Sequence, residues 1–396
     1  MSDSSIPRSR SRGSSRRRRS RFIDQALFTQ PELLAERLLI HVDATRAGWV
    51  RDHLNTGRSG LVIGGPKALR KTLDLREEGY EDVLLADPAF YEHGVATADL
   101  PYLQRAGEFP TTDPLGQAVQ EQLAVGATAA LTPTGYLRAG DTAAVRAAVR
   151  EVAVREDPRI VLALPIDVGW LQIDMIDRLI DELSAAPGSK AIMLGGQLDP
   201  LASFPDALTG LTRVLAQIPG TALLRADLAA FGALAGGAAF AGYGLSGRLR
   251  HVVPPGEPAK SSGFADSPSV LFPELMALFL GKTLARRFAA TYAPVCECTA
   301  CGHRPLDSFP SNRDGRPAAQ HNTSVLLSWQ QALHTLAPGP DRQRWWQERC
   351  RTAVNRYPLV NAAIQQPNGF KVQPQLLRWS LLNMAAPSTS TGAGAD

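Results

Sequence analysis

The chain has 396 residues, with 42 Lys or Arg, 38 Asp or Glu and a formal net charge of +4, and 44% of its residues are hydrophobic. This is a globular composition: 13 Phe, 29 Pro and only 4 Cys exclude a disordered chain, a coiled coil and a disulfide-rich secreted module. The length allows two or three average domains, or one α/β barrel with an appendage.

The positive charge is concentrated at the amino terminus. Residues 1–22 contain eight Arg and a single acid, Asp3, so the rest of the chain is slightly acidic. This Ser/Arg-rich segment has almost nothing apolar to bury, and we expect residues 1–22 to form a disordered tail. Three interpretations of it stay open: a passive leader, an electrostatic arm for RNA or DNA, and an organelle transit peptide. We expect residues 385–396 to form a second disordered tail.

Eight short apolar segments follow one another along the chain, each bounded by turn residues. They lack polar alternation, which is typical of strands buried on both faces of a parallel sheet. The expected strands are Leu38–Asp43, Gly60–Gly64, Asp82–Asp87, Ala127–Thr132, Ile160–Asp167, Ala191–Gly196, Thr221–Arg225 and Ala238–Gly244.

Segments with helical spacing lie between several of these strands. An alternation of strand and helix repeated eight times predicts the α/β class, as a (β/α)8 TIM barrel with a zinc-binding subdomain after the last strand and C-terminal helices; the alternative is an open doubly wound sheet. The predicted boundaries are 23–250 for the barrel, 251–335 for the zinc-binding subdomain and 336–384 for the C-terminal helices. The expected helices are Pro66–Glu78, Ala143–Glu156, Ile173–Ala185 and Pro205–Gln217.

One uncharged stretch, Leu228–Gly247, is long enough to span a bilayer. Six of its residues are Gly, so we interpret it as a helix, a turn and a buried strand, and we expect no membrane span.

A barrel of this type carries its chemistry at the carboxyl ends of its strands. Asp227 is interpreted there as a helix N-cap. Asp87, which precedes the turn at Pro88, and Asp167 are the stronger functional candidates. The strand ends carry Asp43, Asp87, Asp167, Gly196, Gln197 and the segment 225–227.

Three of the four cysteines fall within six positions, at Cys296, Cys298 and Cys301, and His321 follows twenty residues later. Zn2+ prefers four N or S ligands in a tetrahedron, and a Cys-x-Cys-x-x-Cys loop with one distant His supplies them. The alternatives are reduced, idle cysteines or one disulfide with a cysteine left over. His303 is the other candidate for the fourth ligand, but the helical spacing after His321 favours His321. A closed Cys3His site predicts one structural zinc ion, and Cys350 is expected to be a buried apolar residue.

An eight-stranded barrel followed by this ligand pattern resembles the tRNA-guanine transglycosylase family over about residues 38–335. The resemblance implies a pentosyltransferase that exchanges guanine in a polynucleotide, tRNA or DNA, for a free 7-deazaguanine base. It further implies that Asp87 handles a proton as a catalytic residue, and that Asp167, Gly196 and Gln197 bind the base. It suggests dimers, homomeric or heteromeric, formed through the zinc region. Thiolates available for a metal favour a reducing compartment, and we expect a cytoplasmic protein.

The chain departs from the family at the nucleophile. The family places an Asp at the end of the last strand, whereas residues 237–248 of this chain, around Gly242, contain no carboxylate. Three interpretations stay open. The protein exchanges bases with Asp87 and a relocated nucleophile such as Asp227; it is a non-catalytic partner subunit that binds nucleic acid; or it is a barrel enzyme of other chemistry.

Overall fold

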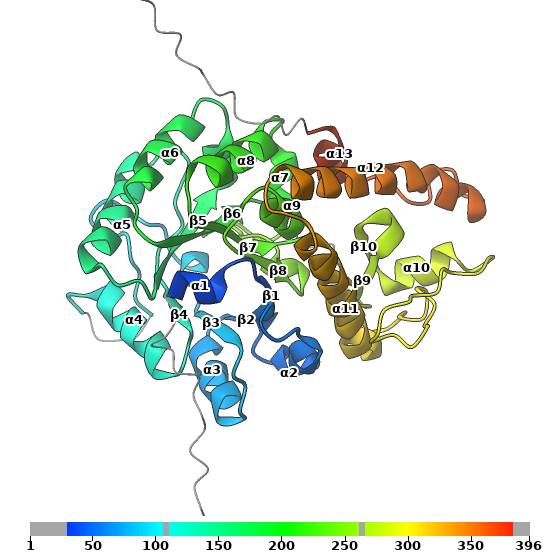
Figure 1. The fold of residues 1–396 in the computed structure, drawn as a ribbon, viewed down its shortest axis with the longest axis horizontal. Coiled ribbons are helices and arrows are strands. Elements are labelled where there is room, and N and C mark those ends of the chain that lie inside the picture. Colours follow the sequence, from blue (N-terminus) through cyan, green and yellow to red (C-terminus); the bar gives the residue numbers. More distant parts are fainter. Residues whose placement is uncertain (1–29, 106–110, 261–265, 383–396) are drawn as a thin grey trace, which may run out of the picture.

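The computed structural model describes residues 30–105, 111–260 and 266–382, and its centre is a closed barrel of eight parallel strands (Figure 1). Consecutive strands pair in chain order, and the eighth strand returns to the first, with Leu38 opposite Ala241. This closure confirms the (β/α)8 class and excludes the open sheet. The strands are β1 (Leu38–Asp43), β2 (Ser59–Gly64), β3 (Val83–Asp87), β4 (Ala129–Leu131), β5 (Ile160–Asp167), β6 (Ser189–Gly195), β7 (Thr221–Ala226) and β8 (Ala241–Gly244).

Both faces of the strands are buried, which explains their continuous apolar sequences. Leu39, Val62 and Leu85 belong to a cluster that fills the inside of the barrel. Their neighbours Leu38 and Leu61 belong to a second, larger cluster shared with the surrounding helices. A strand that packs against both clusters has no position for a solvated polar residue until it reaches the end of the barrel.

Helices surround the barrel, and the four that the sequence predicts are confirmed: α3 (Ala68–Glu77), α5 (Thr142–Arg155), α6 (Ile176–Ser184) and α8 (Ala207–Gln217). Asp141 caps α5 by accepting a hydrogen bond from the Ala144 amide. The stretch 228–247 forms a helix and the strand β8, as expected. The other helices of this part are α1 (Gln30–Leu34), α2 (Ala47–Val50), α4 (Pro114–Ala124), α7 (Pro200–Ser203) and α9 (Ala229–Ala235).

The chain after the barrel adds a two-stranded antiparallel sheet, the cysteine-bearing loop and long helices, which lie beside the barrel (Figure 1). The helix that carries His321 packs against α2 and the first of the two added strands, and the helix after it packs against α9. These contacts fix the appendage to the barrel. The elements are β9 (Ser269–Phe272), β10 (Ala277–Leu280), α10 (Gly281–Arg287), α11 (Gly315–His334), α12 (Pro340–Ala363) and α13 (Pro374–Leu381).

The two tails predicted at residues 1–22 and 385–396 lie outside the described residues, and the division of the chain at residues 250 and 335 stays a prediction. Among the helices of the described ranges, none has the length and apolar character that crossing a membrane requires.

Candidate functional site

The three clustered cysteines and His321 come together after the barrel. Their four ligand atoms all lie within 4.8 Å of one another, and the group could hold a metal ion such as zinc. The Cys301 Sγ lies 3.0 Å from the His321 Nδ1, and the Cys298 Sγ lies 3.6 Å from it. Three sulfurs and one imidazole nitrogen are the donor set of a closed structural zinc site.

The helix α11 holds the His321 ring from outside the loop. The ring Nε2 donates to the Leu271 carbonyl of β9 at 2.7 Å, which leaves Nδ1 free to face the cysteines. A backbone partner of this kind fixes the tautomer and the orientation of a metal-binding histidine. The next residue, Asn322, bonds β9 through both its side-chain oxygen and its side-chain nitrogen. His303 is exposed, has a left-handed backbone with φ of 65°, and is not part of the group.

The three thiols and the imidazole shift one another's pKa values. A hydrogen bond with Cys296 is the largest cause of a strongly lowered pKa at Cys298 and of a strongly raised pKa at Cys301. Contacts with Cys296 and Cys298 outweigh burial and raise the pKa of His321 to about 9. Three thiols and one imidazole this close together form a donor set that suits a divalent cation with affinity for sulfur and nitrogen.

A cavity of about 670 Å³ lies directly against this cluster. Cys296, Cys298 and Trp329 are among its lining residues. One side of the metal group is therefore reachable from solvent by a small molecule.

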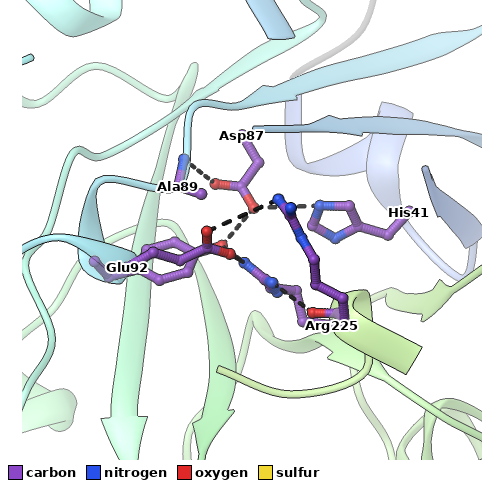
Figure 2. Close-up of polar contacts among 7 residues, drawn as sticks. His41, Asp87, Ala89, Glu92 and Arg225 are labelled. Carbon is purple, nitrogen blue, oxygen red and sulfur yellow. Dashed lines mark hydrogen bonds and ion pairs between the residues drawn. The ribbon is translucent and has the colours of Figure 1, made fainter. Parts of the chain in front are cut away.

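Asp87 occupies the carboxyl end of β3, where the sequence predicts chemistry. The backbone turns sharply there, because Ala89 has a left-handed φ of 59°, and the Ala89 amide donates to the Asp87 Oδ1 at 2.9 Å. The Tyr91 hydroxyl donates to the other oxygen at 2.5 Å. The His41 Nε2 lies 3.2 Å from that same oxygen, although its alignment is too poor for a hydrogen bond. The carboxylate is thereby enclosed inside the barrel mouth (Figure 2).

Arg225 connects this carboxylate to a second one. The pairing of β7 with β8 shifts register between Leu223 and Ala226, and Arg225 has a left-handed φ of 49°. Its guanidinium donates to the Tyr91 hydroxyl and to the Glu92 Oε1, both at 2.8 Å, and to the Arg248 carbonyl at 2.8 Å. Figure 2 shows the resulting chain of contacts from His41 to Glu92.

The charges of this network follow from burial and from its internal contacts. Burial favours the neutral form of Asp87, but His41 and Arg225 outweigh it and the pKa of Asp87 is lowered, so it is ionised. Burial lowers the pKa of His41, against the opposing effect of the nearby Asp87 carboxylate. Burial raises the pKa of Tyr91 well above its ordinary value, so its hydroxyl keeps the proton that it donates to Asp87. Arg225 is thus the permanent cation between two carboxylates.

The other predicted base-binding residues lie apart from this network. Asp167 accepts the Tyr136 hydroxyl and the Gly169 amide, each at 2.8 Å. Gln197 is half-buried and bonds the segment that follows β8, at Glu257 and Lys260. No hydrogen bond or ion pair between described residues joins Asp87 to Asp167, Gly196 or Gln197.

Neither β8 nor Asp227 places a nucleophilic carboxylate beside Asp87. A Cβ added at Gly242 would meet the Leu224 side chain at 2.6 Å, so that position of β8 is closed by core packing. The Asp227 side chain accepts the Ala229 amide at 2.9 Å, but the N-cap residue of α9 is Leu228, so the N-cap interpretation of Asp227 is wrong. Burial raises the pKa of Asp227, and its carboxyl group interacts with Gln375 of α13, on the outer side of the barrel wall.

Sequence reasoning missed two members of the mouth network, His41 and Glu92. His41 follows Leu39 by two residues, so it shares the inward face of β1, one layer nearer the mouth. That position was a usable signal. Glu92 lies in a 3-10 turn, Phe90–Glu92, and nothing in the local sequence marks it.

Comparison with known proteins adds no family. The chain matches no protein-family model and no curated protein sequence. The resemblance to the transglycosylases therefore rests on a closed eight-stranded parallel barrel and on the Cys3His group after it.

Proposed function

We propose that this protein exchanges guanine for a 7-deazaguanine-type base in a polynucleotide, tRNA or DNA. The main support is Asp87, an ionised carboxylate buried at the carboxyl end of a strand, in a barrel followed by a Cys3His group. Reactions at the anomeric carbon of a sugar proceed through positively charged transition states, and carboxylates held in a dry site stabilise them.

In this proposal the other predicted residues bind the base. Each Asp167 oxygen accepts one hydrogen bond in the structure and keeps acceptor capacity for the N–H groups of a purine edge. Gly196, the first residue after β6, has a φ of 147°, a conformation that favours glycine. Because this position has no side chain, a base can approach its backbone closely. Gln197 lies beside it. Zinc, when bound by the four ligands, supplies structure and no chemistry to the exchange.

A second candidate is a non-catalytic partner subunit that binds nucleic acid and pairs with a catalytic chain. The observation that favours it is the closed position at Gly242, where Leu224 fills the space of a carboxylate from β8. A protein of this kind would keep the barrel and the metal group and would show no exchange by itself.

One assay separates the two candidates. The purified protein is incubated with labelled 7-deazaguanine and with tRNA or duplex DNA, and the label in the polynucleotide is counted. We expect incorporation by the wild type, and a loss of at least about 10³-fold for Asp87→Asn, assayed below its melting temperature. Tight binding of either polynucleotide with no incorporation by the wild type would support the partner subunit instead.

A further inference from the structure

Glu92 is the exposed end of the mouth network. Its Oε1 accepts from the Arg225 Nη1 at 2.8 Å, and the same nitrogen donates to the Tyr91 hydroxyl, which reaches Asp87 (Figure 2). Arg248 approaches the other oxygen at 3.9 Å. Two carboxylates of one site are therefore linked through a single guanidinium.

The two carboxylates differ in access. The Glu92 side chain is 26% exposed, whereas the Asp87 side chain is 3% exposed and the Arg225 side chain 2%. Both oxygens of Asp87 already have partners, at Ala89 and Tyr91. A group that attacks a sugar carbon must reach the substrate, and in this network Glu92 is the carboxylate placed to do so.

The remaining acids near the mouth fit an attack less well. β8 supplies no carboxylate, and the Asp227 carboxyl group already accepts the Ala229 amide and interacts with Gln375 of α13. Asp43, at the end of β1, is comparably exposed at 28%, but its partner is Arg46 at 3.4 Å and no hydrogen bond joins it to Asp87 or Arg225. It lacks the fixed orientation that Arg225 gives to Glu92.

We propose that Glu92 is the nucleophile of the base exchange, an assignment that rests on the function proposed above. A Glu92 oxygen forms a bond to C1′ as the bond from C1′ to the guanine N9 breaks. The electron pair leaves with the guanine, which takes a proton from water. The incoming base then loses its ring N–H proton to water and attacks C1′ with that nitrogen, and the ester bond to Glu92 breaks to restore the carboxylate. No redox step is involved.

Arg225 has a positioning role in this scheme. It orients one Glu92 oxygen by a hydrogen bond and leaves the other oxygen, 3.9 Å from Arg248, with acceptor capacity. Asp87 balances the buried charge of Arg225 through Tyr91. The buried part of the network thereby holds the exposed carboxylate in place.

The test traps the covalent intermediate. The wild-type protein is mixed with tRNA or duplex DNA without an incoming base, denatured rapidly, and analysed for a covalent adduct of protein and polynucleotide, whose position is mapped by peptide mass spectrometry. We expect an adduct on Glu92. Glu92→Gln keeps an oxygen for Arg225 but is no nucleophile, so we expect no adduct and an exchange rate lower by about 10³-fold or more. The matched control, Asp43→Asn, should exchange within about twofold of the wild type.

The outcomes distinguish this assignment from the function on which it rests. An active wild type whose adduct maps elsewhere, or an active Glu92→Gln, overturns the assignment of Glu92 alone. A wild type with neither exchange nor adduct overturns the proposed function as well. Wild-type zinc content and a cooperative melting transition above the assay temperature in Glu92→Gln show that a loss of exchange does not come from misfolding.

Discussion

The metal group and the mouth network are both buried polar clusters, but they are assembled in opposite ways. The metal group draws three ligands from one short loop and the fourth from α11, and all four are groups that bind a soft metal ion. The mouth network draws its members from β1, β3, β7 and the turn after β3, and its central cation, Arg225, is paired with Glu92 inside the protein. The donor set of the first cluster suits an ion from outside, whereas the charges of the second interact with one another.

This difference sets what each cluster does. A site that is completed by an ion gains its stability from binding, so its segment of chain depends on the metal. A network of buried, mutually interacting charges favours one arrangement of side chains and is costly to disturb, because removing one member leaves the others with fewer partners. We therefore expect the metal group, when it binds an ion, to hold the appendage in place, and the mouth network to fix the arrangement of its side chains.

Metal removal is expected to have the largest effect. Apparent binding energies of structural zinc in peptides are about 10–16 kcal/mol, so a strong chelator should unfold the segment between β10 and α11. The cavity beside Cys298 gives the chelator access. We expect one zinc per chain by metal analysis, a large fall in melting temperature with chelator, and no bound metal in Cys298→Ser. Cys350→Ala, which alters a buried cysteine outside the group, should keep one zinc per chain. A wild-type protein that contains no zinc, and whose melting curve the chelator does not change, would show that the cysteine group does not depend on a metal.

Removing one charge from the mouth should have the next largest effect. Asp87→Asn removes the ionised carboxylate that accepts from Ala89 and Tyr91, while the direct ion pair of Arg225 with Glu92 stays. Losing hydrogen bonds to a buried charged group in this way costs about 1.5–3 kcal/mol of the free energy of unfolding. We expect this loss in urea denaturation at pH 7, against less than about 1 kcal/mol for Asp43→Asn, whose ion pair is partly exposed.

The pH dependence of that loss has a definite sign. The pKa of Asp87 is lowered in the folded state, so its stabilising contribution is present above its unfolded pKa of about 3.9 and is lost as the pH falls through the folded value. The gap between the wild type and Asp87→Asn should therefore narrow toward pH 3. A gap that stays constant would mean that Asp87 is not ionised in the folded protein.

The barrel was predictable because each strand packs against one apolar cluster inside the barrel and another outside it. Both faces of the strand are therefore apolar, which gives a continuous apolar run in the sequence. β1 and β5 have the predicted bounds. β4 is shorter than predicted, Ala129–Leu131, because its pairing with β3 and β5 covers only that length. The helix α4 and the hairpin of β9 and β10 were not predicted, because the first begins far along the chain from β3 and the second consists of four-residue strands.

The metal group and the mouth network also differ in how far the sequence predicts them. Three metal ligands lie within six residues, so their spacing alone indicates the chemistry, and the helical run after His321 favours the fourth. The mouth network depends on where separate strands end relative to one another. It also depends on the left-handed backbone at Arg225, which no local pattern announces. A contact such as that of Arg225 with Glu92, 133 residues apart, is a consequence of barrel closure.

The smallest expected effect tests how the fourth metal ligand is chosen. His303 lies closer in sequence to the cysteines than His321, but it is exposed and its φ is 65°. His303→Asn removes the imidazole and keeps a residue that tolerates a left-handed backbone, so we expect one zinc per chain and a change below about 0.5 kcal/mol in the free energy of unfolding. His321→Asn, the matched change on α11, should abolish zinc binding, because it removes the ring that the Leu271 carbonyl orients toward the thiols. Loss of zinc in His303→Asn, or its retention in His321→Asn, would show that the loop folds back on itself to complete the site and that α11 does not supply the ligand.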